Sequence, residues 1–341
     1  MTNSKPIRII FYGTSSFAVP ILRALCDDKR LQIIAVVTQP DRPVGRHAVL
    51  TGSPVKQVAQ EKNLDVRAYE KVKSLEAFED LKTIKADVAV VASFGQIIPQ
   101  RVLDLTPHGA INVHGSILPK YRGASPVAAA IREGEMETGI TIMKMDALMD
   151  HGPVLAIAKE SIGADDTAGS LLERLALLGA KTLPNVLVDY IAGQIVPQEQ
   201  DHAAATTIGL LDRENGAINW NKPATEIERL VRAYDPWPGT FTMLDGKRLK
   251  ILKTSIGAPT DLAPGTFFIH DGALEVACGE HTSLRLDRIQ PEGKSPMPGP
   301  VWINGVRSRY PQGGSFVAKH NAHRAGVAPR IDGQTSERDA A

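Results

Sequence analysis

The sequence predicts an α/β protein in which a Rossmann-like, mostly parallel sheet forms an N-terminal domain and a small OB-like β-barrel forms a C-terminal domain. Apolar strand patterns alternate with helical patterns up to residue 193, as in successive βαβ units. Beyond residue 240 the chain instead carries short strands separated by turn signals. A length of 341 residues is also long for one hydrophobic core, so two domains are expected.

The first strand, turn and helix lie at the N-terminus. Ile7 to Tyr12 is an apolar run that ends at Gly13, and Thr14-Ser15-Ser16 offers a cap for a helix with apolar periodicity through Leu25. This turn has a single glycine, whereas a dinucleotide-binding turn has the pattern G-x-G-x-x-G. We therefore expect a Rossmann-like sheet that does not bind a dinucleotide.

The rest of this half supplies the remaining strands and helices. Ser53-Pro54 and Ser125-Pro126 are helix starts, because serine caps a helix and proline suits its first position. Asp165-Asp166-Thr167 caps a long helix with a broad leucine face, which closes the first domain near Gly193. The expected strands are 31–38, 88–92, 110–113, 138–145 and 154–159, and the expected shorter helices are 53–62, 74–82 and 125–132.

Residues 39–52 are expected to form a loop, because their prolines and glycines are turn signals. The segment is longer than the connection needs, and such loops are often functional or mobile. Arg42, Arg46 and His47 are candidates for contacts with phosphates, although a solvated loop tip explains them equally well.

The second half begins after the long helix. We assign residues 1–193 to the first domain, 194–215 to a linker of irregular composition, and 216–317 to the OB-like domain. Residues 318–341 lack periodicity, and we expect a disordered tail there.

The OB-like domain opens with a helix that carries Ile227, Leu230 and Val231 and ends at Asp235-Pro-Trp-Pro-Gly239. Positive and negative residues are nearly balanced across this domain, so counting charges indicates no basic face. The expected strands are 241–244, 249–254, 265–269, 274–277 and 283–289.

Composition indicates an ordinary soluble protein. Hydrophobic residues make up 43% of the chain and charged residues 23%, and the formal net charge of +1 gives no global attraction to nucleic acid or membrane. Cys26 and Cys278 belong to no CxxC pair, which argues against a disulfide framework or a zinc ribbon. The sequence shows no secretory signal and no run of membrane-spanning length. We expect a cytoplasmic monomer without a membrane partner.

Polar groups cluster at one predicted strand end. Asn112 and His114 are two residues apart, so their side chains project from the same face of the strand. Open α/β sheets bind ligands at the carboxyl ends of their strands, where the turns at Gly13 and Ser93–Gly95 are also expected. Asp150, in a later loop, would add a carboxylate. Taken singly, these are a polar strand end and an ordinary turn aspartate.

Three chemistries can be considered for this group. A hydrolase using Ser116, His114 and Asp150 is a poor match, because no G-x-S-x-G elbow presents the serine. A metal site built from His108, His114 and His151 has no known ligand spacing, so no metal is expected. Acyl transfer to an amine needs a donor for the oxyanion, a polarising group and a base, and Asn112, His114 and Asp150 fit those roles.

Three motifs resemble the 10-formyltetrahydrofolate-dependent formyltransferases. They are Asn112-Val-His114-Gly-Ser-Ile-Leu-Pro119-Lys-Tyr-Arg-Gly123, Thr138-Gly-Ile-Thr-Ile-Met and Asp146-x-x-x-Asp150-x-Gly152, and the similarity extends over roughly residues 5 to 310. The resemblance implies that Asn112, His114 and Asp150 are catalytic. It also implies that Ser116, Ile117, Leu118 and Pro119 bind the folate co-substrate.

Within this family the chain is most similar to members that formylate initiator methionyl-tRNA. Pro40-Asp-Arg-Pro-Val-Gly-Arg46 followed by Ser53-Pro-Val-Lys56, Ile218-Asn-Trp220, and the Trp-containing motif at 235–239 carry that likeness. It implies that Arg42 and Arg46 contact tRNA and that the OB-like domain helps to hold it. The alternatives are formylation of an amino-sugar nucleotide, or binding of tRNA or folate without catalysis.

One departure concerns the loop at 39–52. The family's loop is commonly rich in lysine after its Gly-Arg, whereas here Arg46 is followed by His47-Ala-Val-Leu-Thr-Gly52. Fewer cations weaken phosphate binding and its dependence on salt. We therefore expect a weaker contribution from this loop to tRNA binding.

Overall fold

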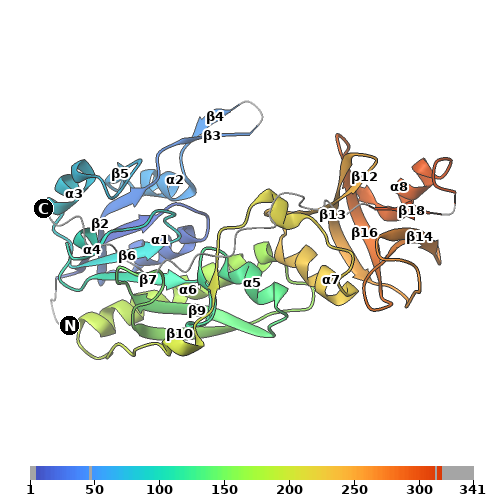
Figure 1. Cartoon of the computed structure of the whole chain (residues 1–341). Coiled ribbons are helices and arrows are strands. Elements are labelled where there is room, and N and C mark those ends of the chain that lie inside the picture. Colours follow the sequence, from blue (N-terminus) through green and yellow to red (C-terminus); the bar gives the residue numbers. More distant parts are fainter. Residues whose placement is uncertain (1–4, 46–47, 312, 317–341) are drawn as a thin grey trace, which may run out of the picture.

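The computed structural model describes residues 5–45, 48–311 and 313–316, which form two units placed one after the other along the molecule (Figure 1). A seven-stranded, mostly parallel sheet organises the first unit, and a curled antiparallel sheet organises the second. The predicted fold class, a Rossmann-like domain followed by an OB-like one, is confirmed. The expected disordered tail at 318–341 lies outside the described residues.

The first sheet has the strand order β10-β9-β7-β6-β1-β2-β5. The five strands from β7 to β5 are parallel, and β9 and β10 extend the sheet in antiparallel fashion beyond β7. Strand β6 is fully buried, as expected for the centre of a parallel sheet. The strands are β1 (Ile7–Gly13), β2 (Leu31–Thr38), β5 (Val66–Ala68), β6 (Val88–Ala92), β7 (Ala110–His114), β9 (Glu137–Lys144) and β10 (Val154–Ser161).

Helices cover both faces of this sheet. One hydrophobic cluster joins four helices of this unit, and the end of a helix of the second unit at Ala233, to one face, and a second cluster joins α3 and α4 to the other. Alternate residues of β1 belong to opposite clusters: Ile9 and Phe11 to the first, Ile10 and Tyr12 to the second. The helices on the first face are α1 (Ala18–Asp27), α2 (Pro54–Glu61), α5 (Pro126–Arg132) and α6 (Ala168–Ile191), and those on the second are α3 (Leu75–Lys82) and α4 (Gln100–Leu103).

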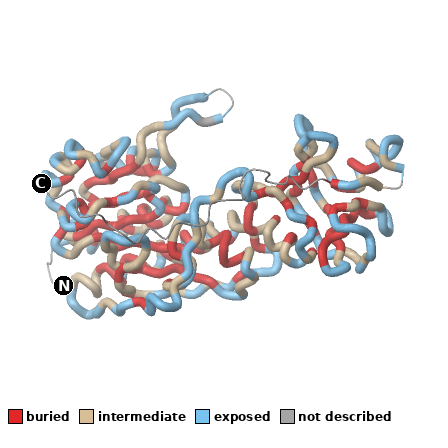
Figure 2. The backbone as a smooth tube through the Cα atoms, in the orientation of Figure 1, coloured by how far each residue is buried: buried red, intermediate tan, exposed pale blue. Residues whose placement is uncertain are grey.

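The second unit has its own core, which is visible in Figure 2 as buried segments separate from those of the first sheet. Its sheet has the order β12-β13-β16-β15-β14-β18, with β17 paired to β16, and the helices α7 and α8 pack on it. Register shifts in β13 bend the sheet. The elements are α7 (Ala224–Ala233), β12 (Thr240–Leu244), β13 (Lys247–Ile256), β14 (Thr266–His270), β15 (Ala273–Ala277), β16 (Ser283–Pro291), β17 (Met297–Pro298), α8 (Gly299–Val306) and β18 (Gly314–Ser315).

The segment between the two units follows the surface of the first one. It contains the short strand β11 (Thr207–Ile208), which pairs in parallel with β8 (Arg122–Gly123), and two 3-10 helices, η1 (His202–Ala204) and η2 (Arg213–Gly216). These contacts attach the segment to the loop that follows β7.

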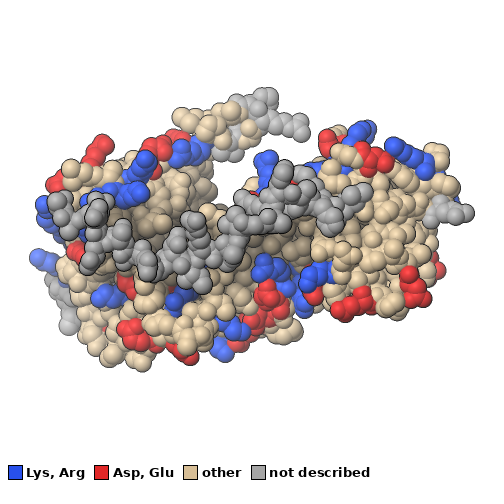
Figure 3. Space-filling view, viewed as in Figure 1, with Lys and Arg blue, Asp and Glu red and all other residues tan. Residues whose placement is uncertain are grey.

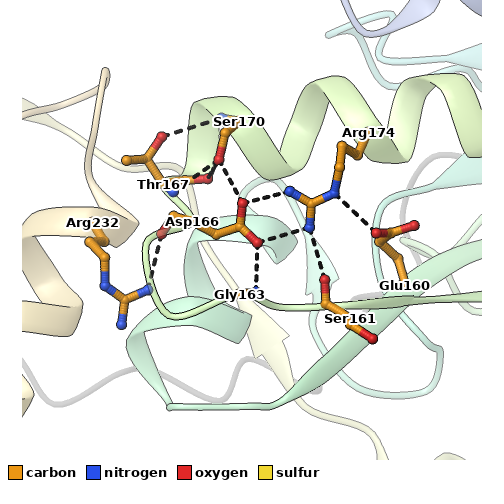
Figure 4. A network of polar contacts seen from close by, with 8 residues as sticks. All are labelled: Glu160, Ser161, Gly163, Asp166, Thr167, Ser170, Arg174 and Arg232. Carbon is orange, nitrogen blue, oxygen red and sulfur yellow. Dashed lines mark hydrogen bonds and ion pairs between the residues drawn. The ribbon is translucent and has the colours of Figure 1, made fainter.

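A polar cluster at the start of α6 joins the two units (Figure 4). Asp166 accepts two hydrogen bonds from Arg174, and its backbone carbonyl accepts one from Arg232 of α7 at 3.0 Å. The Arg174 guanidinium holds the pKa of the Asp166 carboxyl well below its usual range. Asp166 thus stabilises the first unit through its side chain and contacts the second through its backbone.

Candidate functional site

The candidate site lies where β1, β6 and β7 end, at the carboxyl edge of the parallel strands. The register pairs Gly13 with Ala92 and Val91 with Asn112, so the three strand ends are nearly level. The turns that follow β1 and β6 therefore meet the end of β7 at one edge. The structure brings together the three loops that the sequence placed there.

The turn after β1 differs from its prediction. Helix α1 starts after Phe17 without a side-chain cap, so the cap expected from Thr14-Ser15-Ser16 is wrong. Thr14 Oγ1 instead donates to the carbonyl oxygen of Phe94, and Ser15 Oγ donates to Ser93 Oγ, each at 2.7 Å. The two hydroxyl groups thus tie the β1 turn to the β6 turn.

Asn112, His114 and Asp150 meet at this edge. Asn112 Nδ2 donates to Asp150 Oδ1 at 3.3 Å, and His114 Nδ1 lies 3.5 Å from Asp150 Oδ2. Asn112 is 9% exposed and His114 6% exposed, so most water is kept away from both groups. Charges and hydrogen bonds have larger effects in such surroundings than in bulk water.

The second nitrogen of His114 fixes the orientation of the ring. His114 Nε2 lies 3.0 Å from the carbonyl oxygen of Tyr121, which can only accept a hydrogen bond. Nε2 therefore donates to this oxygen, and Nδ1 is left facing a carboxyl oxygen of Asp150.

The Asp150 loop is tightly constrained. Gly123 N donates to Asp150 Oδ2 at 2.8 Å, and Asp150 itself has a φ of +48°, in the left-handed region. At Gly152 a Cβ atom would lie 2.0 Å from the carbonyl oxygen of Lys144, so only glycine fits there. The loop therefore holds Asp150 in a backbone conformation that costs energy.

The Ser116–Pro119 turn follows directly. Ser116 is fully buried, and its hydroxyl donates to the carbonyl oxygen of Lys120 at 2.6 Å. Thr141 Oγ1 donates to the Ser116 carbonyl oxygen and accepts from the Leu118 amide, which anchors the turn to β9. Ser116 and Leu118 are buried, whereas Ile117 and Pro119 are partly exposed. A buried, engaged hydroxyl also argues against Ser116 as a nucleophile.

The described residues of segment 39–52 include a strand pair, so the expectation of a loop alone was wrong. Strands β3 (Arg42–Val44) and β4 (Val49–Thr51) pair in antiparallel fashion, and the hairpin projects away from the first unit (Figure 1). Val49 is 61% exposed and Leu50 is 68% exposed. Figure 3 shows the surface hollowed between this hairpin and the second unit.

Of the predicted tRNA contacts, Arg42 lies on this hairpin. Arg42 is exposed and forms an ion pair with Glu70 at 2.8 Å. Arg46 and His47 lie outside the described residues. At the base of the hairpin, Lys56 Nζ lies 2.7 Å from Asp41 Oδ1 and ties β3 to the first turn of α2.

Exposed cations lie on two adjacent strands of the second unit. The register of β13 and β16 pairs Lys253 with Arg288, and Lys250 is exposed on the same strand as Lys253. Among the described residues, no carboxylate forms an ion pair with any of these three. The balanced charge count of the sequence therefore conceals two cations, Lys253 and Arg288, that face each other across neighbouring strands.

Two buried polar residues next to the site were not predicted. Arg122 is 8% exposed and Gln200 is 7% exposed, and they contact each other. Arg122 belongs to the run that follows His114, which was its only signal in the sequence. Gln200 stands in the predicted linker among exposed residues, and no pattern distinguishes it.

Comparisons with known proteins agree with this geometry. A family model described as formyl transferase matches residues 7–187, and another described as formyl transferase, C-terminal domain, matches residues 210–307. A methionyl-tRNA formyltransferase of Roseiflexus castenholzii is 45% identical over 303 residues, covering 88% of this chain and 96% of that protein. One from Desulfotalea psychrophila is 43% identical over 309 residues, covering 90% and 95%.

Solved structures show the same fold at lower identity. An N-formyltransferase from Helicobacter canadensis, in complex with folinic acid and dTDP-3-aminofucose, has a TM-score of 0.62 at 19% identity and covers 84% of this chain and 99% of its own. HypX from Aquifex aeolicus, in complex with tetrahydrofolic acid, has a TM-score of 0.57 at 14% identity, covering 89% and 48%. At these identities the likeness concerns the fold alone.

Proposed function

Because this chain belongs to the methionyl-tRNA formyltransferase family, we propose that it transfers the formyl group of 10-formyltetrahydrofolate to the free amino group of methionyl initiator tRNA. The product, N-formylmethionyl-tRNA, serves translation initiation. The observation that supports this chemistry at residue level is the convergence of Asn112, His114 and Asp150 at one strand end.

The transfer is a direct acyl transfer through a tetrahedral intermediate. The amino nitrogen forms a bond to the formyl carbon, the bond from that carbon to N10 of the folate breaks, and one proton moves from the amino group to N10. Asn112 Nδ2 and His114 are the groups that stabilise the negative charge developing on the formyl oxygen. The Asn112 amide now donates to Asp150 over 3.3 Å, a weak bond that is readily exchanged for one to that oxygen.

Asp150 carries the proton. Its Oδ2 is held by the Gly123 amide and faces His114, while its Oδ1 faces Asn112. A carboxylate in this position accepts a proton from the amino group as its nitrogen bonds to the formyl carbon, and returns that proton to the leaving nitrogen. His114, fixed by the Tyr121 carbonyl, keeps the ring plane aligned for this exchange.

The Ser116–Pro119 turn is proposed to contact the folate. Ile117 and Pro119, which are partly exposed, would present the apolar surface. Ser116 and Leu118 would contribute by holding the turn against Thr141, because their side chains are buried. Substitutions of Ile117 or Pro119 should therefore change KM for folate. Substitutions of Ser116 or Leu118 should instead change the stability of the protein.

Two basic surfaces are proposed to hold the tRNA. Arg42 on the hairpin and Arg46, which follows β3 in the sequence, form one surface, and Lys250, Lys253 and Arg288 on the sheet of the second unit form the other. Phosphate contacts of this kind fix the position of a nucleic acid without reading its sequence. The hollow between hairpin and second unit in Figure 3 offers room for the acceptor end.

The organisation of the chain follows from these assignments. We assign catalysis to residues 1–193, the connection to 194–215 and tRNA contacts to 216–317. Asn112, His114 and Asp150 come from one chain, which supports a monomer as the working unit. Cys26 and Cys278 are both free, which suits the reducing cytoplasm. None of the helices among the described residues has the length and apolar character needed to span a membrane.

A formyl-transfer assay with two acceptors tests the proposal. Purified protein is supplied with 10-formyltetrahydrofolate labelled in the formyl group and with either methionyl initiator tRNA or an amino-sugar nucleotide. Label is expected in the tRNA. Label in the sugar alone would replace the proposal with the amino-sugar alternative, and label in neither acceptor would favour a binding protein.

A further inference from the structure

Gln200 has an unusual position for a residue of the connection between the two units. Its side-chain amide is buried and lies against the Asp150 loop. Gln200 Nε2 donates to the carbonyl oxygen of Asp150 at 2.9 Å and to that of Gly152 at 2.7 Å. Both amide protons thus bond to carbonyl groups on either side of His151, so this one side chain spans the loop.

Arg122 fixes the orientation of that amide. Its Nε and Nη2 atoms donate to Gln200 Oε1 at 3.2 and 2.7 Å. An arginine can only donate, so the Gln200 oxygen must face Arg122 and the amide nitrogen must face the loop. Among the described residues no carboxylate pairs with Arg122, although it is buried. The guanidinium therefore relies on neutral acceptors, of which Gln200 is the principal one.

A third contact links this pair to the loop from the other side. Arg122 Nη2 donates to His202 Nδ1 at 2.9 Å, and the His202 ring stacks on the His151 ring with centroids 4.0 Å apart and planes 2° apart. His151 follows Asp150 directly, and its Nδ1 lies 2.7 Å from Asp146 Oδ2. The connection thus holds the Asp150 loop through both a hydrogen-bonded amide and a ring stack.

We propose that Gln200, held by Arg122, is a positioning residue that keeps the Asp150 carboxylate in reach of Asn112 and His114. Asp150 has a left-handed backbone, a conformation that costs a non-glycine residue energy unless its surroundings enforce it. The two bonds from Gln200 enforce it at the carbonyl groups of Asp150 and Gly152. This inference rests on the proposed catalytic role of Asp150.

The substitution Gln200→Glu tests this role with little change in shape. A glutamate keeps the contact with Arg122 as an ion pair, but it places a carboxylate oxygen, which cannot donate, against two carbonyl oxygens. We expect kcat for methionyl-tRNA to fall by about 10- to 100-fold, with KM for both substrates changed by less than about threefold. Unchanged kcat in folded protein would overturn the proposal.

Gln198→Glu is the matched control. Gln198 is exposed, two residues earlier in the same segment, and its side-chain amide donates to the Val196 carbonyl oxygen at 3.1 Å, away from the Asp150 loop. The same change of charge there should leave kcat unaltered. An equal loss in both variants would show a general charge effect on tRNA and would also overturn the role given to Gln200.

A double-mutant cycle with Asp150→Asn separates positioning from a general loss of structure. If Gln200 acts through the Asp150 carboxylate, adding Gln200→Glu to Asp150→Asn should lower kcat no further. An equal further loss would overturn the proposal. Should Gln200→Glu fail to fold, Gln200→Asn, which keeps an amide but shortens its reach, enters the same cycle with the same expectation. A wrong proposed function would give a different result from a wrong role for Gln200. In that case wild type and Gln198→Glu would themselves not formylate methionyl-tRNA.

Discussion

The end of β7 and the β3–β4 hairpin serve one proposed reaction but are held very differently. At the end of β7, Asn112 and His114 are almost fully buried, and each contacts a fixed partner. On the hairpin, Val49 and Leu50 are mostly exposed. Figure 2 shows the same contrast along the backbone. Chemistry requires groups that are positioned before the substrate arrives, whereas a large acceptor can be met by a projecting element.

The largest effect is expected at the end of β7, where the side chains are firmly held. Asn112→Ala and His114→Ala each remove a group that stabilises the developing charge, so kcat should fall by about 10²- to 10⁴-fold. tRNA affinity should change little, because neither side chain is exposed. Single-turnover formylation and filter binding measure the two quantities. His281→Ala, at an 80% exposed side chain, is the control. Near-normal turnover of both variants would remove the site assignment.

Asp166 shows whether firmly held contacts serve stability without serving catalysis. Asp166 is bonded as firmly as Asp150 but lies at the start of α6, away from the strand end. Asp166→Asn should lower the free energy of unfolding by about 2 kcal/mol at neutral pH and leave kcat nearly unchanged. Urea unfolding measures the loss, and Asp261→Asn, at a 97% exposed side chain, is the control.

The pH dependence of this loss has a defined sign. The pKa of Asp166 is depressed in the folded protein, so the carboxylate stabilises the fold above its ordinary pKa and ceases to do so as the pH falls through the depressed value. The difference in free energy of unfolding between wild type and Asp166→Asn should therefore be constant above about pH 5 and become smaller below about pH 4. A gap that widens on acidification would contradict the assigned cause.

Much of the fold could be predicted because its signals are local. Ser53-Pro54 starts α2 as expected, with Ser53 accepting from the Lys56 amide, and the apolar run 88–92 coincides with β6. Elements without such signals were missed: β5 has three residues, and α4 has four. Short segments of this kind give no measurable periodicity.

Of the site, the sequence could predict the residues that share one strand, but not the partners that come from distant segments. Asn112 and His114 project together because they are two apart, but Gln200 lies 50 residues from Asp150 and 78 from Arg122. The cap assigned to Thr14-Ser15-Ser16 was wrong for the same reason, because Ser15 bonds to Ser93, 78 residues away. Partners brought together by the sheet leave no local pattern.

A smaller effect is expected at the base of the hairpin. Lys56→Met removes the partner of Asp41 and should destabilise the hairpin locally by about 1 kcal/mol. Hydrogen exchange of the amides of 49–51 should accelerate, and KM for tRNA should rise several-fold at unchanged KM for folate. Lys62→Met, at the other end of α2 and paired with Asp27, is the control. Unaltered exchange would mean that other contacts hold the hairpin.

Arg46→Ala should change the affinity for tRNA and leave the rate of formyl transfer unchanged. Loss of one phosphate contact should weaken tRNA binding by roughly three- to tenfold and reduce the slope of log affinity against log salt by about one. The rate of formyl transfer at saturating tRNA should be retained. A slope equal to that of wild type would show that Arg46 does not contact phosphate.

The smallest effect is expected for Arg42, because its ion pair with Glu70 competes with any phosphate. Arg42→Ala should weaken tRNA binding by less than about threefold, since an exposed ion pair is worth only about 0.2–1 kcal/mol and is lost when the phosphate is gained. Glu70→Gln frees the guanidinium and should tighten binding slightly. Salt titrations of both variants measure this, with the Arg42→Ala/Glu70→Gln double variant as control. If Glu70→Gln tightened binding equally with and without Arg42, its effect would be general removal of negative charge, and Arg42 would have no place in the tRNA-binding surface.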